Sequence, residues 1–195
     1  MKKIKYLLLA SVIGFGLLAS ANAAVETYTI DPVHSSAGFT LRHMVSRFTG
    51  SFTKVTGTIT VDRDNMEKSS VVASVDVGSV NTANEKRNDH LKSPDFFDFA
   101  KFPTMTFKST SWKKTGEDTY DVTGDLTIKD TTKPVVLKVT SLGYSPGMKP
   151  GTTLSGWEAT TTIHKSDFGL GGPAMLGKVL GDDVAVTIGV EAHNP

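Results

Sequence analysis

The chain has 195 residues, of which 21 are Lys or Arg, 20 are Asp or Glu and none is Cys. A formal charge of +1 provides no basic excess for nucleic-acid binding, and the lack of cysteine excludes a disulfide framework. A chain of this length can form one domain that is stabilised by a buried apolar core.

The N-terminus has the features of a secretory signal peptide. Three lysines precede an apolar stretch from Tyr6 to Ala19, and Ala21-Asn22-Ala23 forms a small-x-small cleavage sequence. This pattern predicts a cleaved signal peptide over residues 1–23 and a mature domain over residues 24–195. Cleavage would leave 18 basic and 20 acidic residues, a net charge of −2. Export without disulfides suits a bacterial periplasm, which is the expected location.

From Val25 onward, apolar and polar residues alternate with the period of two that is typical of β-strands. A change of parity predicts a bulge or bend near Lys54. In a later strand, Met105 and Phe107 share one face, and strict alternation places Trp112 on the other. The expected strands cover residues 27–30, 37–42, 48–61 with the bend, 71–80, 104–113, 120–128, 134–139, 156–164 and 184–190.

The stretch from Asn84 to Phe107 interrupts this alternation. Asn81-Thr82 can cap a short helix over Ala83–Leu91, and Ser93-Pro94-Asp95 has the composition of a second helix start. The segment also concentrates aromatic side chains, namely Phe96, Phe97, Phe99, Phe102 and Phe107. These rings either plug one end of a core or line the entrance to an apolar cavity.

Consecutive strands with short connections predict a single all-β domain, an antiparallel barrel of about eight strands with a short helical insertion. A β-sandwich is the main competitor. A barrel of this size is either filled by side chains or holds one elongated ligand. Gly50 and Gly124 lie on otherwise apolar faces, where each could leave interior space or relieve a sharp bend.

Asp31, His34 and Ser35 supply the residue types of a hydrolase triad, but they are crowded into one short segment. This crowding favours a turn in which Asp31 accepts hydrogen bonds from the backbone and His34 makes a hydrogen bond at the barrel end. The histidines are not paired at a spacing typical of a zinc site. The sequence therefore assigns no catalytic residue, no metal site and no cofactor.

Several short motifs, in their order and spacing, resemble the YceI-like family of bacterial periplasmic polyisoprenoid-binding proteins. The motifs are Tyr28-x-Ile30-Asp31-x-x-His34-Ser35 with Phe39 and His43; Gly50-x-Phe52 with Gly57; Ser79-Val80-x-Thr82; Arg87-x-Asp89-His90-Leu91-x-Ser93-x-Asp95-Phe96-Phe97-Asp98; Phe102-Pro103-x-x-x-Phe107; Gly124-x-Leu126-Thr127-Ile128; Asp167-Phe168-Gly169; and Glu191-Ala192. The resemblance spans nearly the whole mature chain. It implies a lipocalin-like barrel whose apolar pore holds an isoprenoid, such as a quinone tail, or a related long-chain amphiphile.

This analogy, combined with strand parity, gives two sets of site residues. The expected ligand-binding residues are Phe39, Phe52, Phe97, Phe107, Leu126, Ile128 and Phe168. The expected polar rim of the cavity mouth consists of His34, Arg87, Asp89 and His90.

The expected function is that of a binding protein that sequesters or carries a lipid, not that of an enzyme. One alternative is a hydrolase or lipid-modifying enzyme that uses His34, Ser35 and Asp31, or His90 and Asp89. Another is an interaction module whose barrel is filled. The expected partners are the lipid or isoprenoid ligand and, transiently, a membrane or membrane redox proteins, with no nucleic acid. The oligomeric state is left open, and a homodimer is one option.

Overall fold

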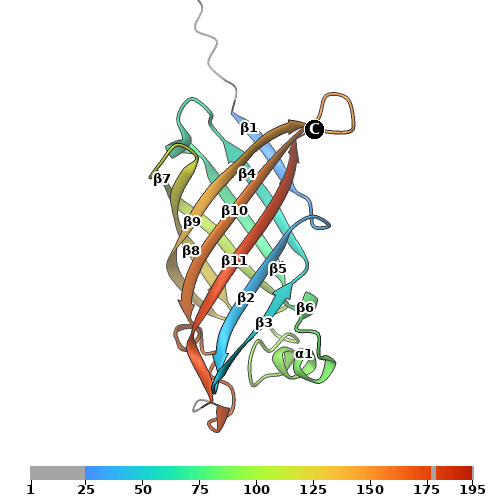
Figure 1. Cartoon of the computed structure of the whole chain (residues 1–195), viewed down its shortest axis with the longest axis vertical. Helices are drawn as coiled ribbons and strands as arrows, with labels where there is room; N and C mark the ends of the chain where they lie inside the picture. Colours follow the sequence, from blue (N-terminus) through green and yellow to red (C-terminus); the bar gives the residue numbers. More distant parts are fainter. Residues whose placement is uncertain (1–24, 177–178, 195) are drawn as a thin grey trace, which may run out of the picture.

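The alternating segments form a closed antiparallel barrel of eight strands in the computed structural model, which describes residues 25–176 and 179–194 (Figure 1). The predicted barrel is thus confirmed. The predicted signal peptide lies outside the described residues and stays a prediction. The strands are β1 (Glu26–Ile30), β2 (Ser36–His43), β3 (Ser46–Phe52), β4 (Val55–Val61), β5 (Ser70–Asp76), β6 (Val80–Asn81), β7 (Thr104–Lys114), β8 (Thr119–Ile128), β9 (Thr131–Pro146), β10 (Thr153–His164) and β11 (Leu180–Asn194).

The barrel closes because β11 pairs with two successive partners. The sheet order is β1-β4-β5-β7-β8-β9-β10-β11-β2-β3-β6, and β1 also pairs with β11 at Ile30↔Ala192. The first part of β11 pairs with β2, as at Val186↔Phe39. The break between β3 and β4 falls at residues 53–54, where the parity change predicts it.

The prediction that Trp112 lies on the face opposite Met105 and Phe107 is wrong. The pairing of β7 with β8 shifts register between Ser109 and Ser111, which is the signature of a β-bulge. The extra residue reverses the alternation beyond this point. Trp112 therefore faces the barrel interior, as Met105 and Phe107 do.

The helical insertion also differs in detail from its prediction. Helix α1 (Glu85–Lys92) is capped at its N-terminus by Asn84, whose side chain accepts a hydrogen bond from the Arg87 backbone N–H at 3.0 Å. The expected cap at Asn81 fails because that residue belongs to β6. Ser93 ends this helix instead of starting another, and its hydroxyl donates to the His90 carbonyl at 2.7 Å. Among the described residues, short 3-10 helices occupy Met66–Lys68, Val77–Ser79 and Lys165–Phe168.

Figure 1 shows α1 and the β2–β3 hairpin at one end of the barrel, opposite the end that holds the C-terminus. The two ends have separate apolar clusters. Tyr28, Trp112 and Trp157 belong to the cluster nearer the C-terminus, and Phe52 and Phe168 belong to the cluster nearer α1. In the described residues, no helix is long and apolar enough to cross a membrane.

The space beside Gly50 and Gly124 is taken by aromatic rings. A Cβ atom on Gly50 would lie 2.4 Å from Cζ of Phe39, and one on Gly124 would lie 2.4 Å from Cζ of Phe107. Each glycine therefore allows a neighbouring phenylalanine ring to lie flat against the sheet. The space next to these two glycines is not part of the empty interior.

Candidate functional site

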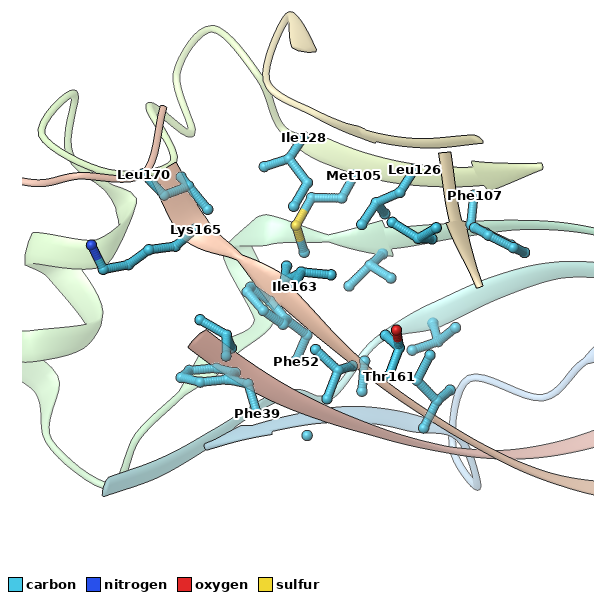
Figure 2. Close-up of a pocket in the computed structure, with 18 of the residues that line it drawn as sticks. Phe39, Phe52, Met105, Phe107, Leu126, Ile128, Thr161, Ile163, Lys165 and Leu170 are labelled. Carbon is cyan, nitrogen blue, oxygen red and sulfur yellow. The ribbon is translucent and has the colours of Figure 1, made fainter. Parts of the chain in front are cut away.

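The barrel interior contains an elongated cavity of about 790 Å³. Its walls consist mainly of aliphatic and aromatic side chains, and 18 of them are drawn in Figure 2. The volume lies within the range of small-molecule sites, about 300 to 1,000 Å³. A filled barrel would lack such a space, so the cavity counts against the interaction module with a filled interior.

Strand β10 follows the cavity along its length. Its alternate residues Trp157, Ala159, Thr161 and Ile163 line the cavity, and Lys165 follows at the start of the next 3-10 helix. From Trp157 to Lys165 the chain advances by about 26 Å at the usual rise of a strand. The lining thus changes from aromatic through small and apolar to cationic along one strand.

Aromatic side chains fill the end of the barrel beyond Trp157. The rings of Trp112 and Trp157 meet edge to face, with centroids 5.8 Å apart, and Tyr144 packs on Trp157 with centroids 6.2 Å apart. The guanidinium of Arg63 lies 3.8 Å from the centre of the Tyr144 ring, an arrangement that is favourable through cation–π attraction. Burial raises the pKa of Tyr144 to about 12. Because Trp112 and Trp157, which line the cavity here, are only 5% and 4% exposed, the cavity is closed at this end.

A polar network lies outside this aromatic layer. Arg63 donates to the Glu26 carboxylate at 2.7 Å and to the Tyr28 hydroxyl at 2.8 Å, and Tyr28 in turn donates to Glu26. The hydrogen bond from Tyr28, opposed by partial burial and assisted by Arg63, holds the pKa of Glu26 below its usual value of 4.5. The carboxylate form of Glu26 thus stabilises the closed end.

This network predicts a pH-dependent contribution to stability. Because folding lowers the pKa of Glu26, its contribution is present above the unfolded pKa of about 4.5 and is lost as the pH falls through the lower folded value. The difference in unfolding free energy between the wild type and Glu26→Gln should therefore be largest near pH 7 and shrink below about pH 4.5. Urea unfolding at several pH values measures it. Glu117→Gln, in an exposed turn, controls for the loss of one negative charge. A difference that does not vary with pH would contradict the prediction.

The opposite end of the cavity is open to solvent. Exposed residues line it there, among them His43 and Ser46 from the β2–β3 hairpin and Lys86 and His90 from α1. The backbone N–H of Met44 donates to the carbonyl of Val179 at 2.7 Å, which joins the hairpin to the glycine-rich segment before β11. The mouth is thus formed by α1, a hairpin and a loop.

Six of the seven expected ligand-binding residues line the cavity: Phe39, Phe52, Phe97, Phe107, Leu126 and Ile128. Phe97 comes from the turn after α1, and its ring meets that of Phe52 edge to face with centroids 5.5 Å apart. The insertion therefore contributes to the cavity wall. Phe168 is 2% exposed and packs in the cluster at this end, but it does not line the cavity.

Only two of the four residues expected to form the polar rim line the cavity. Arg87 and His90 line the cavity near its mouth. Asp89 is exposed and forms an ion pair of 2.9 Å with Lys92. His34 lies in the β1–β2 loop and does not line the cavity. The rim interpretation therefore suits only Arg87 and His90.

The hydrogen bonds of the hydrolase candidates do not form a relay to a serine. His34 pairs with Asp31 at 2.8 Å, but the buried Ser35 hydroxyl donates to the carbonyl of Glu191 and accepts from its backbone N–H. His90 pairs with Asp95 at 3.0 Å instead of with Asp89. The two hydrogen bonds of Ser35 connect the β1–β2 loop to β11, which is a structural role.

A grouping that the sequence did not predict brings Glu191 to His34 and Asp31. One ligand atom from each side chain lies within 4.8 Å of the others. The hydrogen bond between His34 and Asp31 raises the pKa of His34 and lowers that of Asp31. These side chains are partly or largely exposed, and ion pairing accounts for their arrangement.

The cavity residues that the sequence did not single out include Trp112, Trp157 and Lys165. The bulge in β7 hides Trp112 from strict alternation. The other two could have been found, since Trp157 and Lys165 share the parity of Ala159 and Ile163. Lys165 is the less obvious of the two because a lysine is rarely placed on an apolar face.

The closed eight-stranded barrel and its elongated apolar interior place the protein in the lipocalin-like class. The YceI-like domain matches residues 28–192. The chain therefore belongs to the YceI-like family, as its sequence motifs indicate.

Known relatives and solved structures agree with this assignment. A UPF0312 protein of Pseudomonas savastanoi pv. phaseolicola is 36% identical over 186 residues, which cover 93% of this chain and 96% of the relative. The YCEI protein of Campylobacter jejuni superposes with a TM-score of 0.68 at 31% identity, covering 78% of this chain and 87% of that one. A polyisoprenoid binding domain from Saccharophagus degradans has a TM-score of 0.65 at 18% identity, with 86% and 98% covered, and shares the fold.

Proposed function

We propose that this chain is an exported protein that holds an isoprenoid, such as a quinone tail, or another long-chain amphiphile inside its barrel. It sequesters or carries the molecule and does not convert it chemically. The observation that supports this most directly is the apolar cavity of about 790 Å³ that is closed at one end and open at the other. Such a shape suits a chain that enters from one end.

The apolar lining can supply the binding energy. Burial of a methylene group contributes about 0.8 kcal/mol, so ten buried carbons contribute roughly 8 kcal/mol before the cost of ordering the chain. That gain is on the scale of micromolar affinity. The barrel from Saccharophagus degradans is a polyisoprenoid binding domain, which supports the view that this fold accommodates such chains.

The test is to purify the mature protein from its native cells without detergent and to analyse an organic-solvent extract by mass spectrometry. We expect a long-chain lipid in near-stoichiometric amount. The N-terminus of the purified protein should begin at about Ala24, and the protein should appear in the periplasmic fraction. Repeated absence of any lipid, together with no binding of an added isoprenoid quinone or long-chain amphiphile, would contradict the proposal.

A further inference from the structure

The ionisable side chains that line the cavity are all basic. They are His43, Lys86, Arg87, His90 and Lys165, and no Asp or Glu lines the cavity within the described residues. All five belong to the open half of the cavity, beyond the aliphatic middle of β10. A ligand with an apolar tail toward Trp157 would therefore place its head group among basic side chains.

Two of these basic side chains are already engaged by the protein. Arg87 donates to the Thr82 hydroxyl at 2.9 Å and to the Thr82 carbonyl at 2.7 Å, and its guanidinium lies 4.9 Å from the centre of the Phe48 ring. His90 forms a hydrogen bond with Asp95 at 3.0 Å. These contacts hold both side chains in place as part of the wall.

Lys165 differs from the other basic residues because its side chain is largely buried and has few polar partners. Its side chain is 10% exposed. The one ion pair that the described part of the chain provides is with Asp182, at 3.9 Å. The carboxylate of Asp182 also accepts hydrogen bonds from the backbone and the hydroxyl of Ser166, at 2.9 and 2.7 Å. A largely buried lysine side chain whose ion-pair partner lies 3.9 Å away would gain from an anion at closer range.

The position of Lys165 suits contact with the head group of a bound ligand. Figure 2 shows its side chain at the opposite end of the view from Phe107, with the nitrogen directed away from the apolar side chains. It is the last member of the series of β10 residues that begins at Trp157 and follows the cavity. A tail that fills the cavity along β10 would bring its head group to the ammonium group.

We propose that the cavity selects amphiphiles with an anionic head group, a carboxylate or a phosphate, and that Lys165 binds this group at the open end. The inference depends on the proposed function and makes it more specific. A charge-assisted hydrogen bond from Lys165 would give its ammonium group a close anionic partner. A neutral head group, such as a hydroxyl or a quinone, would leave the ammonium group with the 3.9 Å ion pair to Asp182 that the described residues provide.

The test compares ligands that differ only in the head group. The affinities of a long-chain fatty acid and of the alcohol with the same chain are measured at pH 8 with delipidated mature protein, and so are those of a polyprenyl phosphate and its polyprenol. The anion should bind about ten- to a hundredfold more tightly than the alcohol, the gain expected of a hydrogen bond between charged groups. Comparison of the two anions distinguishes a fatty acid from a phosphorylated carrier lipid.

Variants at position 165 then locate the selectivity. Lys165→Met should remove the preference for the anion and leave the affinity for the alcohol within about twofold, because methionine keeps a long apolar stem. Lys165→Arg should retain the preference. Lys108→Met, at an exposed position on β7, removes a lysine elsewhere and should behave as the wild type.

The possible outcomes separately test the preference for anions, the role of Lys165 and the proposed function. Equal affinities for the acid and the alcohol in the wild type would overturn the anion inference and leave the proposed function intact. Failure of all four ligands to bind would overturn both. A preference that persists in Lys165→Met would overturn the role of Lys165. Lys165→Gln provides the same comparison if the methionine variant does not fold.

Discussion

Replacement of Ala159 by tryptophan should abolish ligand retention and leave the barrel folded. Ala159 faces the middle of the cavity, between Trp157 and Thr161 on β10. An indole at this position would obstruct the cavity and exclude the tail from its closed end. Loss of about four buried methylene groups would cost roughly 3 kcal/mol, which is more than a hundredfold in affinity. Because the new side chain enters empty space, it should cause little overpacking.

Displacement of a fluorescent fatty-acid probe measures the affinity, and thermal unfolding of the delipidated protein measures stability. The matched control is Thr160→Trp, which adds the same ring to the exposed face of the same strand. Retention of wild-type affinity by Ala159→Trp would place the ligand outside the cavity. An equal loss of affinity in both variants would show that a tryptophan in β10 disturbs the barrel in general.

The second large effect should come from Gly57, where alanine should destabilise the protein strongly. Gly57 lies on β4 with φ = +144°, a backbone conformation that other residues rarely adopt. A Cβ atom there would lie 2.1 Å from the carbonyl oxygen of Val72 and 2.8 Å from Cα of Ala73. Both contacts are with backbone, so no side-chain rotation relieves them. Backbone strain and overpacking together should cost about 3 kcal/mol, or roughly 6 to 12 °C in Tm for a domain of this size.

Gly189→Ala is the control for this variant. Gly189 lies on β11, and a Cβ atom at this position would have no atom within 4 Å. Alanine should therefore be neutral there, or raise stability slightly by restricting the unfolded chain. Urea unfolding of both variants gives the two free energies. A similar loss of unfolding free energy at the two positions would mean that the close approach of β5 to Gly57 does not affect stability.

Alternation made most of the barrel predictable. In a strand, parity reports directly which side chains share a face, and the regular series in β8, with Val122, Leu126 and Ile128, faces the cavity as expected. The bend near Lys54 was predicted for the same reason, because two runs of opposite parity cannot share a face without an irregularity.

The misplaced residues have physical causes that a pattern of alternation does not contain. Trp112 depends on a bulge, which inserts a residue without a distinctive composition. Ser93 caps the end of α1 because its hydroxyl can bond to a preceding carbonyl as readily as to a following N–H. Lys165 was overlooked because the pattern treats a charged residue as outward-facing, whereas here it lies on the inner face. Glu191 meets Asp31 and His34 only because β11 changes partners.

The aromatic layer formed by Trp112, Trp157 and Tyr144 has a kinetic consequence for the exchange of ligands. A barrel that is sealed beyond these rings cannot be refilled from one end while it empties at the other. Under the proposed function, the occupant must leave through the mouth before the next molecule enters. The residence time of the bound lipid, and not the concentration of its competitor, then sets the rate of turnover.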